Sequence, residues 1–170
     1  MQDLNDFYRT NPALFVLDND PAGFRWINCI SAEKCMLSFM RLGHKVEDSL
    51  VIVANFANIK QTFEIGVHLE GKFREVFNTD ESRYGGSGRM NEGLIETEER
   101  EIDDFPFSYT VQAAPLSLMV FAYEPFTEEE LENLTKRKED QIKKRLADEI
   151  AAAKKKAQSE INKVRRGKNK

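Results

Sequence analysis

Seven short apolar runs, each bounded by turn residues, lie between residues 24 and 123 of this chain. Runs of this length that alternate between apolar and polar residues, or are continuously apolar, are typical of β-strands. Many short strands without crossover helices between them favour an antiparallel sandwich or barrel over a parallel sheet. We therefore predict a mainly β fold, an antiparallel β-sandwich. The strands are expected at residues 24–30, 35–42, 50–56, 62–67, 71–77, 107–111 and 116–123.

Helical patterns flank the strand region on both sides. Leu4, Phe7 and Tyr8 recur at helical spacing and predict a short N-terminal helix. Beyond the last strand, Thr127 is followed three residues later by Glu130, which is the pattern of a capping box. We therefore expect a long C-terminal helix, whose apolar positions form only a narrow stripe.

Charge is divided unevenly along the chain. Residues 1–123 carry 11 basic and 19 acidic side chains, net −8, whereas residues 124–170 carry 14 and 10, net +4. A charged helical tail of this kind binds a polyanion, pairs with a partner helix, or is simply solvated. Because its apolar stripe is narrow, we favour the solvated extension.

Neither a membrane span nor an export signal can be recognised. No run approaches the ~20 consecutive apolar residues of a membrane-spanning helix, and the opening residues lack the basic and apolar regions of a secretory signal. We expect a cytoplasmic protein that does not bind membranes. Cys29 and Cys35 are then expected to be reduced thiols in a small apolar environment, although a disulfide across a hairpin is geometrically allowed.

No residue spacing in the sequence indicates a catalytic or metal site. His44 and His68 lie far apart and form no cluster with the cysteines. Asp18 and Asp20 lie beside aromatic residues, but a glycosidic mechanism needs two carboxyls that face each other across a sugar. We therefore interpret this pair as turn chemistry, and predict no cofactor and no metal.

A long irregular segment, residues 78–107, separates the fifth and sixth predicted strands. It contains Tyr84-Gly-Gly-Ser-Gly, whose spacing matches neither a nucleotide-binding fingerprint nor a phosphate loop. A loop this long in a compact domain is either functional or disordered. We favour a flexible connection over a backbone that approaches a ligand closely.

Two N-terminal segments and five later blocks resemble one enzyme family in order and spacing. The segments are Asp-Leu-Asn-Asp-Phe-Tyr-Arg (3–9), continuing through Pro-Ala-Leu (12–14), and Asp-Asn-Asp-Pro-Ala-Gly-Phe-Arg-Trp-Ile (18–27). The blocks are Ser-Phe-Met-Arg (38–41), Val-Ala-Asn-Phe (53–56), Phe-Arg-Glu-Val-Phe-Asn-Thr-Asp (73–80), Tyr-Gly-Gly-Ser-Gly (84–88) and Ala-Pro-Leu-Ser (114–117). Over residues 2–122 the chain resembles the 1,4-alpha-glucan (glycogen) branching enzymes, where their catalytic barrel ends and their C-terminal domain follows.

The resemblance implies the C-terminal part of an alpha-amylase-type glycosyltransferase of glycogen biosynthesis, which cleaves an α-1,4 linkage and rejoins the chain through α-1,6. It implies that residues 1–23 are the last helix and strap of the catalytic barrel and that residues 24–123 are a C-terminal all-β domain. For the charged tail, residues 124–170, it implies nothing. The family's catalytic carboxylates lie in the barrel, so we expect no catalytic residue in this chain. The expected partners are that barrel and an α-glucan.

Aromatic rings are the candidate glucan-binding groups. Trp26, Phe24 and Tyr84 could offer ring faces to sugar C–H groups. The alternative to an accessory domain is a stand-alone glucan-binding module or a tail-mediated interaction module. A domain without its barrel is also expected to expose an apolar patch and to self-associate. The candidates for this patch are Leu4, Phe7, Leu14, Phe15 and Leu17.

Overall fold

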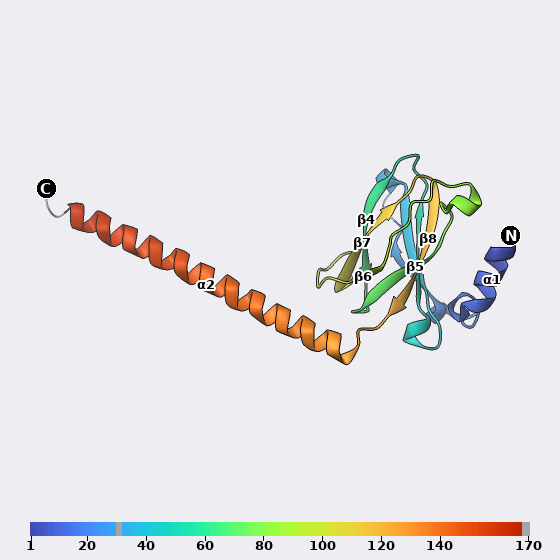
Figure 1. The fold of residues 1–170 in the computed structure, drawn as a ribbon, viewed down its shortest axis with the longest axis horizontal. Coiled ribbons are helices and arrows are strands. Elements are labelled where there is room, and N and C mark those ends of the chain that lie inside the picture. Colours follow the sequence, from blue (N-terminus) through green and yellow to red (C-terminus); the bar gives the residue numbers. More distant parts are fainter. Residues whose placement is uncertain (30–31, 168–170) are drawn as a thin grey trace. The chain divides into compact units, whose positions relative to one another are not determined.

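Two antiparallel sheets form the first unit of the chain, Met1–Pro125, and a long helix forms the second, Phe126–Lys170 (Figure 1). The computed structural model describes residues 1–29 and 32–167. The predicted fold class, an antiparallel β-sandwich with a short N-terminal helix and a long C-terminal helix, is confirmed.

In the described part of the chain the large sheet has six strands, and the small sheet has two. The order in the large sheet is β1 (Phe24–Asn28), β2 (Met36–Arg41), β3 (Leu50–Asn55), β8 (Ser117–Glu124), β5 (Lys72–Asn78) and β6 (Leu94–Glu96), while β4 (Gln61–Val67) pairs with β7 (Phe107–Ala113). The helices are α1 (Gln2–Thr10), α2 (Glu128–Gly167) and the short 3₁₀ helices η1 (Pro12–Leu14), η2 (Pro21–Gly23), η3 (Ala32–Lys34), η4 (Val46–Asp48) and η5 (Ser82–Tyr84). Seven of these strands lie where they were predicted, whereas β6 lies inside the segment expected to be irregular. The end of the first predicted strand, at residue 30, falls outside the described residues.

Large aromatic side chains fill the space between the two sheets. The rings of Phe73 on β5 and Tyr109 on β7 stack with centroids 4.3 Å apart and planes 8° from parallel. Phe121 on β8 meets the Tyr109 ring edge-on at 5.8 Å. All three side chains are almost completely buried. Burial of one such side chain contributes about 1.5–3 kcal/mol, so this ring stack is a main link between the sheets.

The outer face of the large sheet, which points away from the small sheet, is apolar as well. Every residue of β3 is buried, because alternate residues face the sandwich core and the outer side. Leu50 and Ile52 face outward and belong to a second apolar cluster, the outer cluster, which also contains Ala13. Phe7 and Leu14 pack against it. The N-terminal segment therefore covers the centre of the outer face.

Arg41 on β2 holds residues 11–23, here termed the strap, against the sheet. Its Nε donates a hydrogen bond to the Ala13 carbonyl oxygen at 3.2 Å, and its Nη2 donates to the Leu14 carbonyl oxygen at 3.1 Å. The same Nη2 pairs with the Asp18 carboxylate at 2.9 Å. The Arg41 side chain is 16% exposed and that of Asp18 is 60% exposed. The two carbonyl contacts are thus the better shielded part of this link.

The helix α2 begins with the predicted capping box. The Thr127 N–H donates to Glu130 Oε2 at 2.8 Å, and the Glu130 N–H donates to Thr127 Oγ1 at 3.3 Å. The acidic first turn also complements the positive end of the helix dipole. The helix runs for 40 residues. Among the residues that the structure describes, none of the helices is long and apolar enough to cross a membrane.

We predict that Arg41→Met lowers the free energy of unfolding by about 2 kcal/mol, because two strap carbonyls lose their donor. Asp18→Asn removes only the exposed ion pair and should cost less than about 1 kcal/mol. Urea unfolding of the two variants, followed by Trp26 fluorescence, measures the difference. Equal losses would mean that the carbonyl contacts do not hold the strap.

Candidate functional site

Three aromatic side chains form a cluster at the β1 end of the large sheet. Phe24 and Trp26 on β1 meet edge-to-face with centroids 5.1 Å apart. Phe39 on β2 stacks on Phe24 at 5.3 Å and meets Trp26 edge-on at 5.8 Å. Trp26 is 50% exposed, while the other two rings are half-buried. This aromatic cluster therefore presents a partly open apolar surface anchored by its inner rings.

The register of β1 against β2 creates the aromatic cluster. Trp26 lies directly opposite Phe39, so both point to the outer face of the sheet. A β-bulge follows and pairs Asn28 with Ser38, which turns Asn28 to the other face. Strict alternation along residues 24–30 predicts Asn28 on the same side as Trp26, and the bulge makes that prediction wrong. Phe39 could not be singled out from the sequence, because its place beside Trp26 depends on the pairing of two strands.

The third candidate ring, Tyr84, lies elsewhere on the unit. Its hydroxyl donates to Asp3 Oδ2 at 3.0 Å, the Arg83 guanidinium lies 4.7 Å from the ring centroid, and the Phe77 ring lies at 5.8 Å. Burial and the hydrogen bond to Asp3 raise the pKa of Tyr84 above its ordinary value. Four strand spacings separate β1 from β5, which is about 19 Å. The structure thus brings Phe24 and Trp26 together and leaves Tyr84 apart.

Exposed apolar side chains of α1 and the strap form a second surface. Leu4 is 51% exposed, Tyr8 48% and Phe15 39%, and the Tyr8 and Phe15 rings lie 5.5 Å apart. These three residues are termed the N-terminal patch. Of the five residues predicted for an apolar patch, Leu4 and Phe15 are exposed, while Phe7, Leu14 and Leu17 are half-buried.

Asp80 organises the glycine-rich segment that follows β5. Its carboxylate accepts hydrogen bonds from Ser87 Oγ at 2.6 Å, the Ser87 N–H at 3.0 Å and the Arg89 N–H at 3.1 Å. These hydrogen bonds lower the pKa of Asp80, and the bonds from Ser87 contribute most. A Cβ on Gly86 would lie 2.2 Å from the Asp80 carbonyl oxygen, so the close turn requires glycine there. Within the segment expected to be a flexible connection, residues 80–89 therefore form a tightly hydrogen-bonded turn.

The other candidate side chains have local structural roles or are exposed. Asp20 accepts from the Ala22 N–H at 2.9 Å, which confirms the interpretation as turn chemistry for Asp20, whereas the Asp18 carboxylate pairs with Arg41. His68 is half-buried. Its burial, and to a smaller extent the positive charge of Arg25, lowers its pKa.

Cys29 and Cys35 are free and exposed, so the expectation of an apolar environment for them is wrong. Within residues 1–29 and 32–167, no three His, Cys, Asp or Glu side chains gather as a metal site would require. What the aromatic cluster and the N-terminal patch offer is apolar ring and side-chain surface, which binds rather than reacts.

Comparison with known proteins gives a consistent set of matches. Residues 26–124 match the family described as "Alpha amylase, C-terminal all-beta domain". The 1,4-alpha-glucan branching enzyme GlgB of Prochlorococcus marinus (strain AS9601) is 41% identical over 125 residues, which are 73% of this chain and 17% of that enzyme. The protein of the same name from Synechococcus sp. (strain WH7803) is 42% identical over 126 residues, 74% of this chain and 17% of that enzyme.

A solved alpha-amylase from H.orenii covers 69% of this chain and 18% of its own, with a TM-score of 0.38 and 17% identity. The sequence matches confirm the resemblance to branching enzymes drawn from the motifs. The chain spans about a sixth of the length of the curated relatives that it matches.

We predict that Asp80→Asn destabilises the first unit by about 1 kcal/mol at pH 7, because an amide accepts fewer of the three hydrogen bonds. The folded-state pKa of Asp80 is lowered, so its stabilisation is complete above the unfolded value of about 3.9 and is lost as the pH falls through the folded value. The difference between the two proteins should therefore shrink below about pH 4. Urea unfolding at pH 7 and pH 3, with the exposed Asp6→Asn as control, tests this. A difference that does not change with pH would contradict it.

Proposed function

The chain belongs to the alpha-amylase C-terminal all-beta domain family, and from this premise we propose that Met1–Pro125 is the accessory unit of a 1,4-alpha-glucan branching enzyme. In this proposal a separate catalytic domain transfers an α-1,4-glucan segment to form an α-1,6 branch. The catalytic carboxylates belong to that domain, and this unit supports it and its acceptance of glucan. The names and identities of the relatives support this assignment.

The observation that carries the proposal is the apolar outer surface of the unit. The N-terminal patch and the aromatic cluster both adjoin the outer cluster, since Phe7, Leu14 and Phe39 all pack against it. Leu4 and Trp26 are each at least half exposed. Exposed apolar side chains gathered around one face are typical of a surface that packs against a partner. A catalytic domain is the partner that fits this proposal.

The division of the chain follows from the same proposal. Residues 1–23 form the final helix and strap of the catalytic domain and lie on the sheet through Arg41. Residues 24–123 form the all-β domain, and residues 124–170 form the charged tail. The tail falls outside the matched family, so its role is argued separately.

A second candidate function is direct contact with glucan at the aromatic cluster. Trp26 is half exposed, and the rings of Phe24 and Phe39 fix its position. Such a surface can stack on the apolar face of a sugar ring. Tyr84 lies too far away to share the same sugar and would make a separate contact.

We predict that the purified chain forms no α-1,6 linkages from an α-1,4-glucan. Joined to the catalytic domain of a branching enzyme, Met1–Pro125 should in contrast support branching. The test replaces the matched segment of the Synechococcus relative with residues 1–125 of this chain and counts α-1,6 anomeric protons by NMR. The double variant Tyr8→Asp and Phe15→Asp should lower branching by at least about tenfold, a loss of ~1.4 kcal/mol in packing. The control is Phe56→Asp, at an aromatic residue that is 62% exposed. Branching by the chain alone would reject the accessory role.

We predict that a long maltooligosaccharide releases heat on binding to the unmutated chain and that Trp26→Ala abolishes this heat. Isothermal titration measures it, after circular dichroism has verified that the variant folds. Phe56→Ala removes an exposed ring elsewhere and should leave binding unchanged. Titration heat that survives in Trp26→Ala would place glucan contact away from the aromatic cluster, and no heat at all would leave only the accessory role.

A further inference from the structure

An apolar position returns every 11 residues along α2. Leu131, Ile142, Ala153 and Val164 occupy it, and Leu146 and Ile150 follow one and two turns after Ile142. Eleven residues in three turns give about 3.67 residues per turn, close to the natural period of an α-helix. These positions, termed the stripe, therefore stay on one side of the helix over its whole length.

The stripe is open to solvent where the structure describes its large side chains. Leu131 is 42% exposed, Ile142 58%, Leu146 51% and Ile150 54%. A long helix in water gains most of its stability from packing an apolar face. Four large apolar side chains in one line favour a partner that covers them.

We propose that α2 pairs with α2 of a second copy of this chain, and that the two helices run antiparallel. The stripe reads nearly the same in both directions about its centre, near residue 148. In the reversed helix Ile142 falls opposite Ala153, while Leu146 and Ile150 lie one residue, about 1.5 Å along the axis, from facing each other. A large residue thus meets a small one on either side of a central pair of large residues, which lets the helices approach closely. The pairing has the two-fold symmetry expected of a homodimer.

The charges of α2 favour the antiparallel direction. The same alignment sets Glu139 level with Lys156, and both lie beside the stripe. A parallel pair would instead bring each basic run, such as 154–156, beside its own copy, and like charges repel. Charge therefore selects a reversed second copy over a parallel one.

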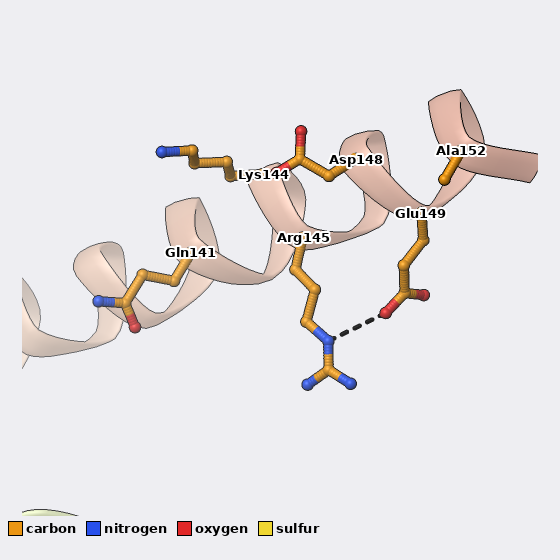
Figure 2. Close-up of a pocket in the computed structure, with 6 residues that line it drawn as sticks. All are labelled: Gln141, Lys144, Arg145, Asp148, Glu149 and Ala152. Atoms are coloured by element: carbon orange, nitrogen blue, oxygen red, sulfur yellow. Dashed lines mark hydrogen bonds and ion pairs between the residues drawn. The ribbon is translucent and has the colours of Figure 1, made fainter. Parts of the chain in front are cut away.

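The face beside the stripe limits how many helices can join. Figure 2 shows this face, from which Gln141, Lys144, Arg145, Asp148 and Ala152 project, together with Glu149, which lies at the edge of the stripe in line with Leu131. Arg145 Nε donates to Glu149 Oε1 at 3.0 Å within the same helix. A polar neighbouring face leaves an apolar stripe wide enough for one partner helix only. The second copy is therefore expected in a dimer rather than a larger bundle.

The first experiment measures the mass of the full chain by sedimentation equilibrium over a range of concentrations. We expect a monomer–dimer equilibrium, and Leu146→Glu should raise its dissociation constant by at least about tenfold. Ala151→Glu adds the same charge to an exposed position about 140° around the helix from Leu146 and should leave the dimer intact. A monomer at all concentrations, or a dimer that survives Leu146→Glu, would overturn the proposal. Heparin binding by a strictly monomeric chain would assign the tail to a polyanion instead.

The second experiment determines the direction of pairing. In a chain with Cys29→Ser and Cys35→Ser, Ile142→Cys and Ala153→Cys variants are mixed and oxidised. The antiparallel pair joins one variant to the other, whereas Ile142→Cys alone gives no cross-link, because its two copies lie about 16 Å apart along the axis. Cross-linking of Ile142→Cys to itself would indicate parallel helices and overturn the proposal. Neither result depends on branching activity.

Discussion

The central strand β3 is buried on both faces, and the arrangement of the first unit depends on that burial. A strand in an antiparallel sheet usually leaves one face to water, but Leu50 and Ile52 make the outer face apolar here. The small sheet covers the inner face, and the strap has to cover the other. Arg41 fixes the strap through backbone carbonyls, so the cover does not rely on an exposed ion pair alone. The strap is thus part of the fold and not a loose extension.

The strap also determines where open surface remains. It covers the centre of the outer face and leaves the aromatic cluster at β1 and the Tyr84 contact near β5 on separate sides. Three rings that could have formed one binding site therefore form two surfaces of different character. Around Trp26 the neighbours are other rings, whereas Tyr84 lies among Asp3, Arg83 and Phe77. Trp26 is 50% exposed and is surrounded by other rings, which makes the aromatic cluster the stronger of these two candidates for contact with a sugar.

The features that could be predicted from the sequence are those that depend on residues close together along the chain. Short apolar runs bounded by turn residues predicted seven strands, and the capping box at Thr127 was predicted because both of its residues lie within one turn. The strand β6 has three residues, Leu94–Glu96, too few for a pattern, and forms by pairing with β5. The separation of Tyr84 from Trp26 depends on β8 lying between β3 and β5, an order that spacing along the chain does not determine. The partners of Phe39 and Asp80 likewise depend on how the chain is folded, so sequence spacing did not indicate them.

The tail, residues 124–170, is stabilised by a different kind of contact from the unit that precedes it. Strand pairing within Met1–Pro125 joins residues far apart in sequence, whereas α2 repeats one local apolar pattern along its length. A dimer held through α2 carries two copies of the aromatic cluster. Because a glucan polymer offers many similar sugars, two weak contacts on one polymer would bind with far higher avidity than either contact alone. The proposed dimer and the proposed glucan contact would therefore reinforce each other, although each rests on its own residues.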